Sequence, residues 1–413
     1  MAKPKLALIP ATQGSKLYSV LPADGVGDFN FSRNSAATRI NKDGLIETVA
    51  VGKSRLNYPL IDGVVNGCPS HLLEPSRLQL IQYSEDFSDA SWTKGGTSVT
   101  SGFVSPDGTL NADKITPTGI NEAHQIYQNK TITSNQSYTI SVFMKFGGYR
   151  YLECRETFGG KGIGFDTTTQ TFYGINTPTS FKGVILKNGW VRMEATYTSI
   201  GTSAFFLLYS TPILMNPTFL GDGTSGFYTW GAQLEQGSYA TSYIPTTSSA
   251  VTRVAETANG AGDASTFNDS EGVLMAEISA LANIGSFENI SLSNGSSASR
   301  VFLFYRNSLN LMEFRVTVNN SIQMVFQHTI ADAKTSNKFA IKYKENDFAI
   351  WINGIEVHTD PNGITFGSFP LTNLSLDNGQ VSSPTDPFKG KTKQLQYFDS
   401  ALNDSDLETI TSW

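Results

Sequence analysis

The feature that most constrains this chain is a two-residue alternation of apolar and polar side chains, which recurs from about residue 77 to residue 246. In SYTISVFMKF the alternation places on one face Tyr138, Ile140, Val142, Met144 and Phe146, and Phe143 is the one apolar side chain on the other face. WVRMEATY repeats the pattern with Val191, Met193, Ala195 and Tyr197. Because side chains of a β-strand point alternately to opposite faces, these stretches predict strands with one buried face. No long 3.6-residue periodicity competes with this pattern, and turn residues recur at intervals of roughly 8–12 residues, so the region is expected to form a jelly-roll β-sandwich.

The stretch from Tyr228 to Arg253 changes character partway along. Up to Glu235 it is typical of a strand, with Tyr228, Trp230, Ala232 and Leu234 expected on one face. From Gly237 onward small polar residues dominate, and a proline removes a backbone donor. We interpret this change as the last strand of one domain followed by a segment that leads to the next domain, and hence as a structural seam rather than an active site.

Composition supports an all-β chain and limits its partners. Charged residues make up only 16% of the 413 residues, whereas about 25% is usual, and 37 glycines indicate many turns. The formal net charge of -6 argues against a nucleic-acid-binding protein, which needs a basic face. We expect no nucleic-acid partner.

Residues 1–76 form the least regular part of the sequence. Gly, Pro, Asn and Asp interrupt every apolar run, as in LPADGVGDF and YPLIDGVVNGCPS. We expect extended chain with short strands, ordered against a partner or a neighbouring subunit; the alternative is a floppy N-terminal arm.

The domain division that follows is 1–76, a jelly roll over 77–246, a linker over 247–265 and a second sandwich over 266–413. The linker is expected to be flexible and to span on the order of 25 Å, although VTRVA within it is also typical of an edge strand.

Residues 266–413 carry the clearest local signals. KFAIKY alternates Phe339, Ile341 and Tyr343 against polar or small residues. Asn353-Gly354 is the pair preferred in a two-residue type I′ hairpin, since both positions need φ > 0. LNDSDLETITS predicts one short C-terminal helix, with Asn403 as its N-cap and a hydrophobic staple between Leu402 and Leu407.

Reactive and targeting motifs are sparse. Cys68 and Cys154 are far apart in sequence and are expected to be unpaired. The four histidines show neither metal-ligand spacing nor a nucleophile signature, and TFGGKGIGF lacks the ending of a phosphate-binding loop. The first residues lack the apolar region of a signal peptide and no apolar run is long enough to span a bilayer, so we expect neither secretion nor membrane insertion.

Four stretches resemble one family: FSRNSAATRINKDGLIE (31–47), HLLEPSRLQLIQYSEDF (71–87), WGAQLEQGSYATSYIPT (230–246) and ETANGAGDASTFNDSEGVLMAEI (256–278). Together, and in this order, they resemble tailed-phage virion proteins described as head fibres, head spikes or tail-fibre-like proteins. The family usually continues the LLEPSR segment with Thr-Asn-Leu, whereas Leu78-Gln79-Leu80 follows here.

This resemblance implies an N-terminal virion-attachment and oligomerisation segment, a carbohydrate-binding-module-like jelly roll and a concanavalin A/laminin-G-like sandwich. It further implies a non-enzymatic structural protein at the virion surface that attaches weakly and multivalently to host-surface glycans. Its partners would be capsid or tail proteins and further copies of itself, with a trimer expected by analogy with other fibres. One alternative is a capsid or tail decoration protein that binds no sugar, and the other is a virion-associated polysaccharide hydrolase.

The hydrolase alternative requires two facing carboxylates, about 5–5.5 Å or 6.5–9.5 Å apart. Glu153 and Glu156 are three residues apart in one strand and are expected to point to opposite faces. The other strand carboxylates each stand alone, although pairing across strands stays open: Asp166, Glu194, Glu235, Glu277 and Glu356. We therefore predict no catalytic residues.

Sugar binding uses aromatic faces with polar neighbours. The candidates are Tyr149, Arg150, Tyr151, Arg155 and Phe158 in the first sandwich and Trp351 in the second. The competing interpretation is that the tyrosines pack internally and that Trp351, which alternates away from the core, covers a neighbouring domain or subunit. Calcium is frequent in laminin-G-like folds, and ENDF (345–348) and TDPN (359–362) offer oxygen ligands, but both are also ordinary turns, so no metal or cofactor is predicted.

Overall fold

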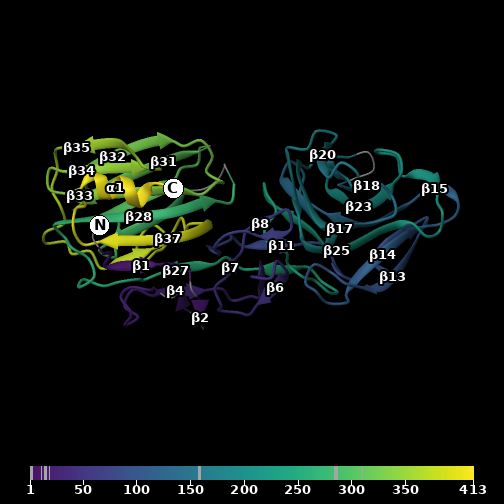
Figure 1. Cartoon of the computed structure of the whole chain (residues 1–413), viewed down its shortest axis with the longest axis horizontal. Coiled ribbons are helices and arrows are strands. Elements are labelled where there is room, and N and C mark those ends of the chain that lie inside the picture. Colours follow the sequence, from purple (N-terminus) through teal and green to yellow (C-terminus); the bar gives the residue numbers. More distant parts are fainter. Residues whose placement is uncertain are drawn as a thin grey trace.

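The computed structural model describes residues 3–10, 12–13, 16–17, 19–156, 160–282, 287–308 and 310–413. It shows two β-sandwiches beside each other along the long axis, with residues of the N-terminal segment running along and between them (Figure 1). Both chain termini lie on the C-terminal sandwich (Figure 1). The chain is all-β apart from one short C-terminal helix and a 3-10 turn, in the part that the structure describes.

The first sandwich consists of two antiparallel sheets that enclose one apolar core. One sheet has the order β13 (Thr97–Phe103), β14 (Ala112–Pro117), β25 (Gly226–Gln236), β17 (Ser137–Gly147), β22 (Trp190–Thr198), β21 (Ser180–Ile185). The other has the order β12 (Thr93–Gly95), β16 (Gln125–Thr131), β23 (Ser203–Thr211), β18 (Tyr151–Arg155), β19 (Gly162–Asp166), β20 (Thr171–Ile175). The turn η1 (Lys187–Gly189) joins β21 to β22, and the pair β15 (Asn121–Ala123) and β24 (Thr218–Leu220) lies at one end.

The alternation predicted for β22 is confirmed, since its four apolar side chains lie in this core. The prediction for β25 is wrong in one respect, because a β-bulge at Gly231 shifts the register against β17. Trp230 therefore packs outside the sandwich with Phe143, whereas Ala232 and Leu234 point into the core. Phe146, expected in the core, is instead 51% exposed near the end of β17.

The second sandwich also consists of two sheets. One has the order β35 (Ile355–Asp360), β34 (Phe348–Ile352), β33 (Asn337–Lys344), β28 (Glu271–Ala280), β37 (Gly390–Phe398), β10 (Ser70–Leu72), β7 (Leu56–Asn57), and β1 (Leu6–Leu8) also pairs with β37. The other has the order β32 (Ser321–Thr329), β31 (Leu311–Val318), β30 (Arg300–Tyr305), β29 (Glu288–Ser293), β36 (Asn373–Ser375). Phe339, Ile341 and Tyr343 of β33 lie in the core between these sheets, as the alternation predicts.

The predicted hairpin and helix are confirmed. Asn353 and Gly354 join β34 to β35 with φ of 50° and 84°, as a type I′ turn requires. Helix α1 (Asp404–Thr411) is capped by Asn403, whose side chain accepts a hydrogen bond of 2.9 Å from the Asp406 N–H. The helix covers the outer face of the sheet, where Leu407 packs in a cluster with Trp351.

Residues 1–76 are ordered against both sandwiches of their own chain. Apart from the strands already named, this region forms these short pairings: β2 (Thr12–Gln13) with β3 (Lys16–Leu17), β3 with β4 (Phe29–Ser32), β5 (Ala37–Ile40) with β6 (Ile46–Val49), and β8 (Leu60–Ile61) with β9 (Val64–Val65). The expectation that a partner chain orders this region is therefore corrected, because β1 and β10 lie along the free edge of β37 and supply its backbone hydrogen bonds.

The expected flexible linker is likewise part of the fold. β26 (Val251–Arg253) pairs with β11 (Arg77–Gln79), which also contacts β25, and β27 (Thr257–Asn259) pairs with β4. The edge-strand alternative for VTRVA is thus the one that the structure shows, and the segment fixes the two sandwiches to the N-terminal region.

Candidate functional site between the two sandwiches

A buried ion-pair network joins the N-terminal region to both sandwiches. We use this name for Arg33, Arg55, Glu74, Arg253 and Glu256, all of which are buried. Glu256 accepts hydrogen bonds from Arg33 Nη1 at 2.7 Å and Arg55 Nε at 2.9 Å, and it also pairs with Arg55 Nη2. Glu74 pairs with Arg55 Nη2 at 2.8 Å and Arg253 Nη1 at 2.7 Å. The network therefore links residues more than 200 positions apart in the sequence.

Electrostatics keep both carboxylates of the network ionised. Burial by itself raises the pKa of Glu74, but Arg253, Arg55 and hydrogen bonds from Ser242 outweigh this effect and hold the pKa well below its ordinary value. The pKa of Glu256 is also lowered, because Arg55 and its hydrogen bonds outweigh the effect of burial. Buried ions of this kind are stable only when every partner is present.

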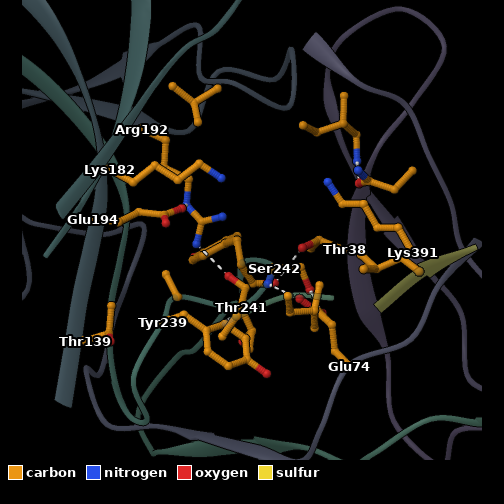
Figure 2. Close-up of a pocket in the computed structure, with 18 of the residues that line it drawn as sticks. Thr38, Glu74, Thr139, Lys182, Arg192, Glu194, Tyr239, Thr241, Ser242 and Lys391 are labelled. Carbon is orange, nitrogen blue, oxygen red and sulfur yellow. Dashed lines mark hydrogen bonds and ion pairs between the residues drawn. The ribbon is translucent and has the colours of Figure 1, made fainter. Parts of the chain in front are cut away.

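A cavity of about 650 Å³ lies directly beside this network, between the two sandwiches. Figure 2 shows Lys182, Arg192 and Glu194 on one side of it, Lys391 on the opposite side, and Thr38, Thr241 and Ser242 between them. Strands β21 and β22 place the first group and strand β37 places Lys391, so neither sandwich alone forms the site. Glu74 connects the cavity to the network, since it accepts hydrogen bonds from Ser242 N at 2.8 Å and Ser242 Oγ at 2.6 Å.

The lining of the cavity is cationic although the chain as a whole carries a net charge of -6. The charged lining residues are Arg39, Lys182, Arg192, Lys334, Lys391, Glu74 and Glu194. Arg192 Nε pairs with Glu194 at 3.3 Å and Arg39 Nε pairs with Glu47 at 2.8 Å. The three lysines form no ion pair with any carboxylate of the described residues. The cavity therefore holds unbalanced positive charge.

Burial lowers the pKa of Lys391, and the Lys182 ammonium lowers it further, while Glu74 and Glu194 oppose this change. The two lysines thus repel each other across the cavity. This repulsion costs free energy, and a negatively charged group placed between the two ammonium groups would relieve it.

Aromatic side chains provide apolar surface next to these charges. Tyr58 and Tyr239 line the cavity. The Phe181 ring, 48% exposed, lies on the other face of β21 from Lys182, next to Gly174 of β20. The Tyr239 ring carries the Arg77 guanidinium on its face, 5.1 Å from the ring centre. A cavity of this volume with aromatic walls and a few convergent polar groups has the general character of a small-molecule or sugar site.

The structure brings three of the predicted sugar-binding residues together, but not in the cavity. Tyr151 and Arg155 lie on the outer face of β18, while Arg150 binds Asp166 through Nε at 2.9 Å and Nη2 at 2.7 Å. The Arg150 guanidinium also lies 4.9 Å from the Tyr151 ring centre. Arg155 is buried and pairs with Glu153 at 2.7 Å, so its donors already have a partner. This small surface stays a prediction for sugar contact.

The remaining predicted residues do not join this surface in the described structure. Tyr149 packs edge-on against Phe219, with ring centres 4.9 Å apart, and its hydroxyl accepts a hydrogen bond from Asp222 N. Phe158 lies outside the described residues. Trp351 faces away from the main core, as expected, but helix α1 of the same chain covers it. The expectation for Trp351 is therefore corrected, because a ring that is 6% exposed presents no face to a sugar.

The turns considered for calcium do not fit a metal. Asp347 pairs with Lys342 at 2.6 Å, and the Asp360 carboxylate accepts the Asn362 N–H at 3.0 Å. Across the described residues, no group of three or more His, Cys, Asp or Glu side chains is placed to share an ion. Cys68 and Cys154 are free, as expected. No helix in the described part of the chain combines the length and hydropathy needed to cross a membrane.

Sequence reasoning missed the cavity because its residues come from distant segments. Each of the four resembling stretches contributes to the cavity or to the network: Thr38 and Arg39, Glu74, the run 238–243, and Glu256. The stretch interpreted only as a structural seam thus lines the site. The charged residues in these stretches, within a chain poor in charge, are the signal that points to their positions. Lys182 and Lys391 carry no such signal.

No family model matches the sequence, and no curated protein matches it. Among solved structures, the chain is similar to the CBM40 of Ruminococcus gnavus IT-sialidase bound to alpha2,3 sialyllactose, with 17% identity over 37% of this chain and 88% of that chain, and a TM-score of 0.32. It is also similar to mouse laminin alpha1 chain domains LG4-5, with 9% identity over 84% and 96% of the two chains and a TM-score of 0.23. The CBM22-1-CBM22-2 tandem domain of Paenibacillus barcinonensis Xyn10C gives 12% identity over 78% and 98%, with a TM-score of 0.25. These likenesses concern the β-sandwich fold alone.

Proposed function

We propose that this chain is a non-enzymatic, carbohydrate-binding structural component of a phage virion, a head fibre, spike or tail fibre that attaches to host-surface glycans. The observation that carries the binding part is the cavity between the sandwiches, where the Tyr239 ring and lysine side chains converge on one space. Stacking on an aromatic ring together with polar contacts is how proteins hold sugar rings.

The carboxylates of the cavity favour binding over hydrolysis. Glu74 accepts from Ser242 and pairs with two buried arginines, and Glu194 pairs with Arg192. A glycosidase needs one carboxyl group that can donate a proton, whereas the pKa of Glu74 is held well below its ordinary value. Both acids are therefore engaged in holding structure.

The binding proposal is tested with two matched tyrosine variants on an array of bacterial surface polysaccharides. Tyr239→Ala removes a half-buried ring from the cavity, and Tyr127→Ala removes a half-buried ring from elsewhere on the first sandwich. We expect Tyr239→Ala to weaken binding by about tenfold, since one stacked ring contributes about 1 kcal/mol or more, and Tyr127→Ala to leave it unchanged. Equal effects of the two variants, or release of reducing sugar by the wild type, would count against the proposal.

The virion part of the proposal is supported by the four stretches that resemble phage fibre and spike proteins, each of which supplies the network or the cavity. Capsid or tail proteins would be the partners, and a homotrimer is the proposed assembly, in which many weak sites act together. Imaging of the phage particle at a resolution that traces this chain tests this part. Exposed sandwiches on an oligomeric fibre are expected. Sandwiches packed flat between capsid subunits would indicate a decoration protein instead.

A further inference from the structure

We infer that the cavity selects an anionic saccharide, one that carries a carboxylate or phosphate group held between Lys182 of β21 and Lys391 of β37. This inference rests on the proposed function and adds the class of ligand to it. It also predicts that the ligand contacts both sandwiches, because the two lysines belong to different ones (Figure 2).

The first argument is charge balance. Five of the seven charged lining residues are cationic, and the ion pairs of Arg39 and Arg192 leave Lys182, Lys334 and Lys391 unpaired among the described residues. Glu74 offers them little, since Arg55 and Arg253 already pair with it. A concave site with one sign of charge concentrates ligands of the opposite sign.

The second argument is geometry. Lys182 is exposed and Lys391 half-buried, so both side chains are accessible from the cavity. Thr38, Thr241 and Ser242 lie between them, but the hydroxyls of Thr241 and Ser242 bind Glu235 and Glu74, and that of Thr38 binds the Tyr243 carbonyl. Lys182 and Lys391 are therefore free donors, with no partner among the described residues, and ammonium groups bind carboxylate and phosphate as point charges. Tyr239 lies at the same cavity and would contact the sugar ring.

The test uses a matched pair of probes, an oligogalacturonate and the same oligosaccharide with its carboxylates methyl-esterified. Titration calorimetry should show that the acid binds at least about tenfold more tightly than the ester, and that added salt reduces the difference. A glycerol-phosphate oligomer forms a second arm, which distinguishes a phosphate-bearing polymer from a uronic-acid polymer as the source of the anion. A single-stranded oligonucleotide of similar charge serves as the control for unspecific attraction.

Lysine variants test whether Lys182 and Lys391 account for the preference for the acidic probe. Lys182→Gln and Lys391→Gln should each weaken binding of the preferred acidic probe by about tenfold, which corresponds to one charge-assisted contact. Lys53→Gln makes the same change of charge at an exposed lysine outside the cavity and should leave binding unchanged. Thermal unfolding of each variant checks that the fold is intact.

Three other results would overturn the inference. Equal binding of acid and ester, with no effect of the lysine variants, would refute anion selection and leave the carbohydrate proposal standing. Equal binding of the oligonucleotide would show unspecific charge attraction. If neither acidic probe binds while the polysaccharide array shows binding that Tyr239→Ala weakens, the inference has failed and the carbohydrate proposal stands.

Discussion

At the scale of single residues, the chain places its buried charges where its segments meet. The ion-pair network has three arginines and two glutamates with almost no exposed surface. Burying ions costs several kcal/mol each, and this cost is offset only when all partners are in place. The network is thus a fixed junction, and loss of one member leaves the others uncompensated.

The substitution Glu256→Gln should therefore destabilise the protein by about 3–5 kcal/mol, since buried Arg33 would lose its carboxylate partner and buried Arg55 would keep only Glu74. Urea unfolding followed by circular dichroism measures this change. Glu47→Gln is the matched control, because Glu47 is 43% exposed and pairs with Arg39 at the surface, where such pairs contribute about 0–1 kcal/mol. A similar cost for both variants would contradict the role assigned to the network.

His71 gives the junction a dependence on pH. It is fully buried next to Arg33, Arg55 and Glu256, and burial lowers its pKa to about 4. The folded state binds a proton at His71 less readily than the unfolded state, in which the pKa of His71 is about 6.5. The contribution of neutral His71 to the free energy of unfolding is therefore present above pH 6.5 and is lost as the pH falls toward 4. Between pH 7 and pH 5 the loss should be about 2 kcal/mol.

His71→Gln should remove the part of this loss of stability that comes from protonation of His71. The measurement is the free energy of unfolding of both proteins at pH 7 and pH 5, where the carboxylates contribute to both in the same way. If the two proteins lose equal stability over this interval, the histidine is not the group that titrates.

At the scale of elements, the local cap of helix α1 affects the packing of strands that are distant in the sequence. The helix closes the outer face of the second sandwich, and Leu407 and Ile410 cover Trp351. Asn403→Ala removes the N-cap acceptor of the Asp406 N–H and should lower the stability of this sandwich by about 1 kcal/mol. Thermal unfolding should show the loss for alanine and little change for Asn403→Asp, which keeps an acceptor. Equal losses for both variants would show that the cap has another role.

A feature of this fold could be predicted from the sequence when its signal lies in neighbouring residues. The strands β17, β22 and β33, the Asn353-Gly354 turn and the cap of α1 each depend on neighbouring residues, and all are found. The bulge at Gly231 reverses the face of Trp230, because one inserted residue shifts the alternation. The glycine is the local mark of this bulge, and the count of alternating residues does not use it. The cavity could not be predicted from the sequence for a related reason. Lys182 and Lys391 meet only after both sandwiches have formed, and pairing across so many residues leaves no periodic trace.

At the scale of the whole molecule, the N-terminal region is a structural part of the second sandwich. β1 and β10 occupy the edge of β37 that β28 leaves open, with Leu6 opposite Tyr397 and His71 opposite Thr392. Leu6, Leu8 and Leu73 also belong to the core of that sandwich. The cavity depends on the same region, since Thr38 and Glu74 line it. We therefore predict that folding of the second sandwich requires the first 76 residues.

A chain that begins at residue 77 should accordingly keep the first sandwich and lose the integrity of the second. Without β1 and β10, the edge of β37 has unpaired backbone donors and acceptors, and exposed edges of this kind promote aggregation. Hydrogen exchange should show fast exchange in β37 (Gly390–Phe398) and retained protection in β22 (Trp190–Thr198), with reduced recovery of soluble protein. A chain that lacks only residues 1–3, which precede β1, serves as the control and should exchange like the full chain. Addition of residues 1–76 as a separate polypeptide should restore part of the protection in β37. Full protection of β37 in the chain that begins at residue 77 would mean that the second sandwich folds on its own, and the N-terminal region would then be free to serve another partner.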